Sequence, residues 1–239
     1  MRLQIQHTTQ FHYDDPPSYG LLQLRTAPQS SAAQTVIAWD ISLDGARKQV
    51  QFKDQHGNRI DLIEVMPDAQ LLEISVSGEV ETHSADGVLG RHHQSMPLWH
   101  YRQQTSLTRL TEGLRELAES IVLPTESTIA DLHSLSQLIR ERVAYTPGQT
   151  GVNTTAGDAL ENAKGVCQDH SHIFISIARE KGFPARYVSG YLLMDDRTSQ
   201  DASHAWSEVY LDGLGWVGFD VSNGISPDER YVRIAQGSD

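Results

Sequence analysis

Residues 165–192 read GVCQDHSHIFISIAREKGFPARYVSGYL, and they join a helical pattern to a strand pattern. The first part carries apolar residues at the three- and four-residue spacing of an amphipathic helix: Ile173, Phe174, Ile177 and Ala178. Gly182-Phe183-Pro184 ends this helix, and a strand-like run over residues 186–193 follows it. The stretch therefore predicts a helix whose apolar face packs on a sheet.

The residues that follow predict the rest of that sheet. Two strand-like runs, 204–211 and 216–221, flank Asp212-Gly213, which is a hairpin signal. A hairpin centred on residue 212 places His204 opposite Asp220. Side chains that lie far apart in the sequence are then neighbours across two strands.

Upstream, the chain first favours strands and then helices. Leu72, Ile74, Val76 and Val80 share one parity with polar residues between them, and shorter runs before them alternate in the same way. Residues 1–95 therefore predict a small antiparallel β-sandwich domain, and residues 96–239 a second domain. Residues 84–104 are interpreted as a linker or crossing loop. Leucine spacing over residues 107–144 predicts two helices that are separated at Pro124. A short helix is expected over residues 156–162.

The composition limits the function classes. The chain has 239 residues, of which 38% are hydrophobic and 21% charged, as in globular proteins. Its formal net charge of −12 argues against nucleic-acid and anionic-membrane partners, since both need a basic surface. No segment approaches the roughly 20 apolar residues of a membrane span. The N-terminal residues lack the apolar core of a secretory signal, so the cytoplasm is the expected compartment.

Metal and cofactor signals are weak. The chain has one cysteine, Cys167, which excludes an intramolecular disulfide and a multi-cysteine zinc site. It has 11 histidines but no HExxH motif, and Asp195, Asp196 and Asp201 are not spaced like a calcium-binding loop. We therefore expect no metal ion and no cofactor.

Cys167 is the first candidate catalytic residue. A lone cysteine is more often a small core side chain than a nucleophile. Cys167, however, follows a glycine-containing turn and enters the first turn of the predicted helix. The free N–H groups and partial positive charge there stabilise a thiolate and an oxyanion. Position alone leaves both interpretations open.

His204 and Asp220 are the candidate partners of that thiol. His204, Trp206 and Glu208 share one face of the predicted strand, which fits either the wall of a cleft or the solvated face of an edge strand. Asp220 ends an apolar strand, where it either opens a turn or holds an imidazole in place. Together the three residue types supply a nucleophile, a base and an orienting carboxylate.

At these residues the chain resembles the transglutaminase-like superfamily, and specifically its bacterial members. Five motifs carry the resemblance: YTPGQT at 145–150, GVCQD at 165–169, GFPARYVSGY at 182–191, SHAW at 203–206 and GWVGFD at 215–220. The N-terminal region resembles the β domain that precedes this core in bacterial members, through Ile5, His7-Thr8-Thr9, Phe11, Tyr13 and residues 54–58. The resemblance implies an α+β fold with a papain-like, transglutaminase-like core, in which helices pack on an antiparallel sheet.

The resemblance also implies roles for the three candidates: Cys167 as nucleophile, His204 as general base and acid, and Asp220 as orienting group. The chain departs from the family pattern in two places. Many members continue the aspartate as Asp-Pro-Thr-Asn, whereas here the sequence is Asp220-Val221-Ser222-Asn223. His170 stands where members often carry an aromatic residue, and we assign it no catalytic role.

The expected reaction is attack of a thiolate on an amide carbonyl, which gives a thioester. A water acceptor makes the protein a cysteine peptidase or amidase, which is the leading hypothesis; an amine acceptor makes it an acyltransferase. A non-catalytic binding module on the same fold is a further alternative. The substrate would be a peptide, a protein or a small amide. Tyr191 and Trp206 are candidate cleft walls or core residues, and Asp169 either binds substrate or caps the helix.

Overall fold

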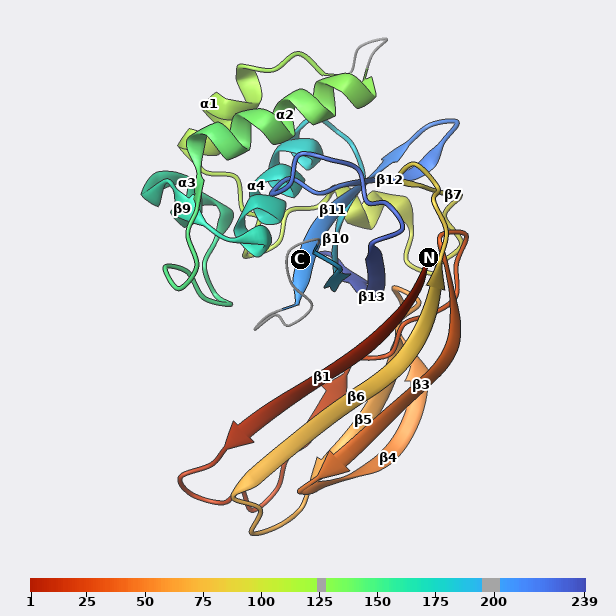
Figure 1. Ribbon diagram of the computed structural model, residues 1–239. Helices are drawn as coiled ribbons and strands as arrows, with labels where there is room; N and C mark the ends of the chain where they lie inside the picture. The colour runs from red at the N-terminus through yellow and green to blue at the C-terminus, as the bar shows by residue number, and fades with distance from the viewer. Residues whose placement is uncertain (124–127, 195–202) are drawn as a thin grey trace.

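The computed structural model describes residues 1–123, 128–194 and 203–239, and the chain folds into two parts (Figure 1). Long strands form the N-terminal part, and helices gather over a second sheet in the C-terminal part (Figure 1). Pro124 and the acidic residues Asp195, Asp196 and Asp201 lie outside the described residues. The predicted α+β class is confirmed.

The N-terminal part consists of two three-stranded antiparallel sheets. One has the order β1-β6-β3, with β1 (Arg2–His12), β6 (Leu71–Thr82) and β3 (Gln34–Asp44). The other has the order β2-β5-β4, with β2 (Leu21–Leu24), β5 (Arg59–Val65) and β4 (Ala46–Lys53). Leu72, Ile74 and Val76 of β6 are buried, as their parity predicted. The two sheets enclose a small apolar cluster.

The C-terminal part has a five-stranded antiparallel sheet in the order β13-β10-β11-β12-β7. Its strands are β7 (Val88–Gly90), β10 (Ala185–Leu192), β11 (His204–Leu211), β12 (Gly215–Phe219) and β13 (Tyr231–Gly237). The helices are η1 (Leu98–Arg102), α1 (Glu112–Glu119), α2 (Thr128–Arg142), α3 (Ala156–Asn162) and α4 (Cys167–Glu180). A short parallel pair joins β8 (Ala144–Tyr145) to β9 (Lys164–Gly165).

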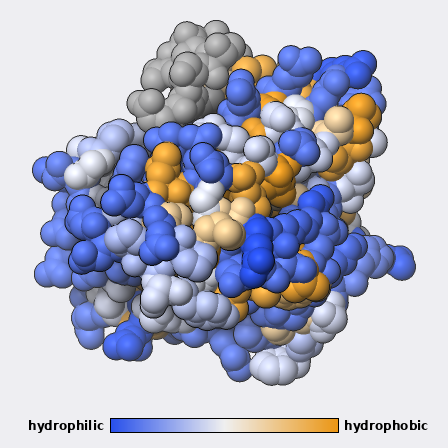
Figure 2. All heavy atoms as spheres, turned by 90° about the horizontal axis from the view of Figure 1, so that it is seen from below, coloured by the Kyte–Doolittle hydropathy of each residue, from blue (hydrophilic) through white to orange (hydrophobic). Residues whose placement is uncertain are grey.

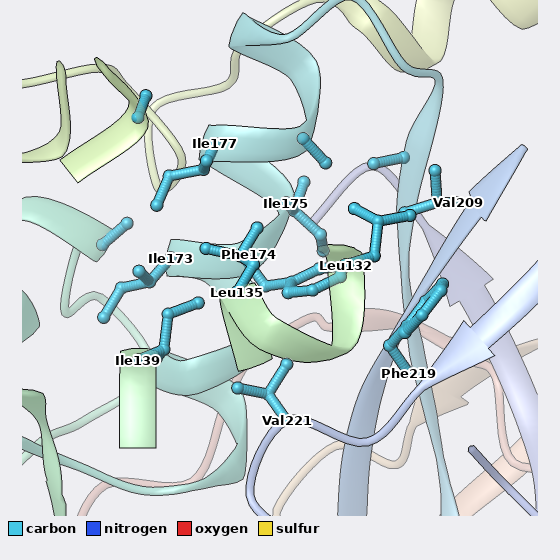
Figure 3. Packing of buried hydrophobic residues seen from close by; sticks show 14 of the residues in the cluster. Leu132, Leu135, Ile139, Ile173, Phe174, Ile175, Ile177, Val209, Phe219 and Val221 are labelled. Atoms are coloured by element: carbon cyan, nitrogen blue, oxygen red, sulfur yellow. The ribbon is translucent and has the colours of Figure 1, made fainter. Parts of the chain in front are cut away.

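The central helix α4 is held from both sides. Phe174 and Ile177 are fully buried, and Figure 3 shows them among residues of α2 and the sheet such as Leu135 and Phe219. The rings of Phe174 and Phe219 lie 5.3 Å apart. Burial of large apolar side chains on both faces fixes α4 against the sheet, and this fixes the position of its first residue, Cys167.

Three local predictions need correction. The helix expected from residue 107 begins only at Glu112, because Thr105 and Thr108 bond each other's backbone N–H groups and hold the chain in a turn. The expected linker contains β7, which pairs with β12, and the fully buried Tyr101. The boundary at residue 95 stays a prediction.

The third correction concerns the hairpin between β11 and β12. Ser207 faces Phe219, so an extension of the ladder places Trp206, rather than His204, opposite Asp220. The cause is the loop, which has three residues, 212–214, with positive φ at Gly213 and again at Gly215. His204 still reaches Asp220, along the diagonal of the ladder.

Contacts between the two parts are polar as well as apolar. The Gln34 side chain donates to the Arg233 carbonyl at 2.8 Å and accepts from the Arg233 N–H at 2.8 Å. Asn58 makes the same kind of two-way contact with the backbone of Gln236. These bonds fasten the N-terminal part to β13, the edge strand of the core.

The surface agrees with the acidic, polar composition. Figure 2 shows the face seen from below Figure 1, where hydrophilic residues predominate and hydrophobic residues gather in smaller patches between them. No helix among the described residues is long and apolar enough to cross a membrane. The cytoplasmic location stays a prediction.

Candidate active site

Cys167 is the first residue of α4, and the chain before it is extended at Val166. Cys167 is buried, with 8% of its surface exposed. Asp169 fixes this helix start: its Oδ2 accepts from the Val166 N–H at 2.7 Å and from the Thr150 hydroxyl at 2.7 Å. The first N–H groups of the helix lack helical acceptors and face the same end.

His204 opens β11 beside the cysteine. Its Nε2 donates to Oδ2 of Asp220 at 2.6 Å, and the ring also makes a hydrogen bond with Cys167. Since Nε2 is taken by the carboxylate, Nδ1 is the nitrogen that serves the thiol. The Trp206 ring stacks on the imidazole, with centroids 6.3 Å apart and planes 29° apart. These contacts hold the imidazole between the sulfur and the carboxylate.

Asp220 follows β12 and is fully buried. Besides His204, its Oδ2 accepts from the Tyr231 hydroxyl at 2.7 Å and from the Asn223 side chain at 2.7 Å. Its Oδ1 accepts from the Asn223 backbone N–H at 3.1 Å. A buried carboxylate with this many donors keeps its charge and one orientation.

The pKa values of the pair move in opposite directions. Burial alone would lower the pKa of His204, but its hydrogen bonds to Asp220 and Cys167 and the charges of both raise it to about 9. Burial alone would raise the pKa of Asp220, but the bonds and charge of His204, with those from Asn223 and Tyr231, lower it. The arrangement therefore favours an imidazolium next to a carboxylate at neutral pH.

A further residue contacts the sulfur. Tyr145, on β8, donates its hydroxyl to Cys167; burial, the charge of Cys167 and this bond raise the pKa of Tyr145. Tyr145 is 54% exposed, so part of its side chain faces solvent. The parallel pair β8–β9 positions it, because β9 leads directly into the turn before Cys167.

The three candidate substrate-binding residues lie in different surroundings. Asp169 is 1% exposed and caps α4, as described above. Trp206 is 3% exposed and packs on His204 and Tyr231. The Tyr191 hydroxyl bonds Nδ1 of His7, on β1 of the N-terminal part, at 2.9 Å. A role of these three in substrate binding stays a prediction.

The solvated edge strand considered for residues 204–210 is not observed. β11 is the middle strand of its sheet, and Glu208 is fully buried. Its Oε2 accepts from Arg186 at 2.7 Å and from Arg233 at 3.0 Å, which compensates the buried charge. The alternating polar residues of this strand suggest exposure, because the sequence alone does not show that arginines of other strands pair with Glu208.

Sequence reasoning missed Tyr231, Asn223 and Tyr145 as contacts of the site. Tyr145 opens the YTPGQT motif at 145–150, and Asn223 ends the segment Asp220-Val221-Ser222-Asn223. Their places in these motifs are the sequence signal that they lie near the site. Tyr231 opens β13, and the Tyr-Val-Arg-Ile pattern at its start is a strand signal in the sequence. Among the described residues, no group of three His, Cys, Asp or Glu side chains is placed to hold a metal ion.

The raised pKa of His204 predicts that stability depends on pH. In the unfolded chain the pKa returns to 6.5, so between about pH 6.5 and 9 the folded state binds the extra proton. This contribution to the free energy of unfolding is complete below pH 6.5 and is lost as the pH rises through 9. Urea unfolding from pH 6 to 10, compared with His204→Gln, measures it. Equal pH slopes for the two proteins would contradict the pairing.

Comparison with known proteins extends over most of the chain. Residues 115–221 match the family model of the transglutaminase-like superfamily, and residues 3–81 match that of the bacterial transglutaminase-like N-terminal region. An uncharacterised protein of Mycobacterium leprae is 28% identical over 251 residues, which cover 100% of this chain and 89% of that protein. The resemblance seen in the sequence is confirmed.

Two further matches concern the fold and part of the core. A candidate cysteine protease from Cytophaga hutchinsonii has a crystal structure that superposes with a TM-score of 0.77 at 19% identity, covering 100% of this chain and 84% of that one. The protein-glutamine gamma-glutamyltransferase of Pseudomonas aeruginosa is 28% identical over 116 residues, which cover 43% of this chain and 16% of that protein.

Proposed function

Because the chain combines a transglutaminase-like core with the bacterial N-terminal region of that superfamily, we propose that it is a cysteine peptidase or amidase that hydrolyses an amide bond. Cys167 is the nucleophile, His204 the general base and acid, and Asp220 the orienting carboxylate. The substrate class is a peptide, a protein or a small amide. The fold, which is both transglutaminase-like and cysteine-protease-like, supports a thiol-dependent enzyme.

One observation carries the proposal. The side chains form a continuous series of hydrogen bonds from the fully buried Asp220 through His204 to Cys167, the first residue of α4. A structural histidine does not need a buried carboxylate on one nitrogen and the single thiol of the chain on the other. This series is what nucleophilic catalysis requires, since the base must touch the nucleophile and must itself be oriented.

Acylation follows from this geometry. The Cys167 thiolate attacks the carbonyl carbon, and the electron pair of the C=O bond moves to the oxygen. Backbone N–H groups at the start of α4 and the Tyr145 hydroxyl are the donors that we assign to that oxyanion. The oxyanion collapses, the C–N bond breaks, and Nδ1–H of His204 protonates the leaving amine. A thioester on Cys167 remains.

Deacylation reverses the proton transfer. Neutral His204 takes a proton from water at Nδ1, and the hydroxide attacks the thioester carbon. The C–S bond breaks, the acid product leaves, and the thiolate–imidazolium pair is restored. Asp220 keeps Nδ1 of His204 directed at the sulfur in both halves of the cycle, because Tyr231 and Asn223 fix its carboxylate.

Acyl transfer to an amine is the second candidate. The observation that favours it is the match of 116 residues to a protein named protein-glutamine gamma-glutamyltransferase. The same thioester serves both reactions, and only the acceptor differs.

The test for hydrolysis offers both acceptors at once. A panel of peptide amides is incubated with the protein and a large excess of a primary amine such as cadaverine, and mass spectrometry follows the products. We expect the free acid to form with little dependence on the amine concentration. Amide product that exceeds the acid, and that requires Cys167, would replace the hydrolase with an acyltransferase. The matched control is Cys167→Ala, which should give neither product.

A further inference from the structure

The two places where the chain departs from the family pattern contact each other. His170 lies on α4 one turn after Cys167, and its Nδ1 is 2.9 Å from the Ser222 hydroxyl. Ser222 belongs to the turn that carries Asp220 and that has Val221 in place of the family's proline. The nucleophile helix and the carboxylate turn are therefore joined by a hydrogen bond between two side chains.

The direction of this bond follows from the other nitrogen. His170 Nε2 lies 2.9 Å from the backbone carbonyl of Val143, which can only accept. The neutral imidazole therefore carries its proton on Nε2, and Nδ1 accepts from the Ser222 hydroxyl. His170 is 1% exposed, and burial is the main cause that lowers its pKa. Both ring nitrogens are thus satisfied in the neutral form.

The position of His170 places it beside Tyr145, one of the groups that contact the sulfur. Residues three apart on a helix share a face, so His170 lies on the same side of α4 as Cys167. Its ring packs at 66° against Tyr145, with centroids 6.0 Å apart. Val143 immediately precedes β8, which carries Tyr145. The His170 side chain therefore contacts two segments that pack against α4: the strand that carries Tyr145 and the turn that carries Asp220.

We propose that His170 and Ser222 form a positioning pair that sets the Asp220 turn against the nucleophile helix, and so aligns His204 with Cys167. A proline in the turn would restrict the backbone dihedral φ on its own. Val221 does not, and the hydrogen bond from Ser222 to α4 supplies the restraint from outside the turn. Neither residue touches a reacting atom. The inference rests on the proposed function of the triad.

The test compares Ser222→Ala with Ser222→Thr, which keeps the hydroxyl, and with His170→Phe, which places the family's aromatic residue on α4. Ser134→Ala is the matched control, since the Ser134 hydroxyl donates to the Ala130 carbonyl one turn earlier within α2. Two readouts are used: the rate of Cys167 alkylation by iodoacetamide at pH 6, and the pKa of His204 from imidazole nitrogen NMR shifts. Melting curves confirm that each variant is folded.

We expect Ser222→Ala and His170→Phe to alkylate about fivefold more slowly than wild type, since one net hydrogen bond is lost, and to show a His204 pKa below the wild-type value of about 9. Ser222→Thr and Ser134→Ala should match wild type. A wild-type His204 pKa and rate in folded Ser222→Ala would overturn the positioning pair. Absence of a raised His204 pKa in wild type itself would instead overturn the proposed triad.

Discussion

Replacing Cys167 by alanine should lower amide turnover by at least about 10⁴-fold, because the covalent step has no other nucleophile. Cys167 is the only cysteine in the chain, so no second thiol can substitute for it. Cys167→Ser should lose a comparable factor, since an alcohol does not ionise next to His204 as a thiol does. Turnover is measured with whichever peptide amide the wild-type protein cleaves fastest.

The alanine variant should remain folded. Cys167 is small, lies at a helix start and is 8% exposed, so its removal leaves no large cavity. Melting temperatures within a few degrees of wild type, with turnover lost, would separate a chemical role from a structural one. Retained turnover in Cys167→Ala would show that the reaction does not pass through a thioester.

Asp220→Asn should reduce turnover by roughly 10³- to 10⁴-fold with the fold intact. The amide is isosteric, but the negative charge that raises the pKa of His204 is gone. An amide also presents an NH₂ group to donors: His204, Tyr231 and Asn223 all donate to Asp220 in the native protein. If the amide NH₂ group takes the place of Oδ2, it faces the donors of His204, Tyr231 and the Asn223 side chain, and the imidazole loses its alignment. If the NH₂ group takes the place of Oδ1, it faces the backbone N–H of Asn223, which is also a donor.

The matched control is Asp228→Asn in the same segment of the chain. Asp228 pairs with Arg230 at 2.6 Å and is one-third exposed, so its charge is compensated by Arg230 and partly screened by solvent. Turnover should stay near the wild-type value. An Asp220→Asn enzyme as active as Asp228→Asn would remove the orienting role from Asp220.

The local elements that position the site were predictable because their signals are local. The apolar spacing of Ile173, Phe174 and Ile177 marked α4, and the glycine and proline after it marked its end. The short helix over 156–162 was found with the bounds that the structure has. Strand parity in β6 likewise gave the buried face of the N-terminal part.

What the sequence did not reveal depends on distant contacts. The hairpin register followed from the positive φ values of Gly213 and Gly215, which a central Asp-Gly pair does not specify. Glu208 indicated exposure because its partners, Arg186 and Arg233, come from β10 and β13. The pairing of His170 with Ser222 joins residues 52 positions apart. Such contacts exist only once the sheet has formed.

The most direct test of the triad is the rate of Cys167 alkylation by iodoacetamide at pH 6, followed by intact mass on native protein. The single cysteine makes the added mass specific to this residue. With wild type we expect alkylation at pH 6 to be much faster than that of a free thiol, and this excess rate to be lost in His204→Ala. Alkylation at pH 6 that is no faster than that of a free thiol in both proteins would contradict a thiolate–imidazolium pair and would leave a binding module on an enzyme fold.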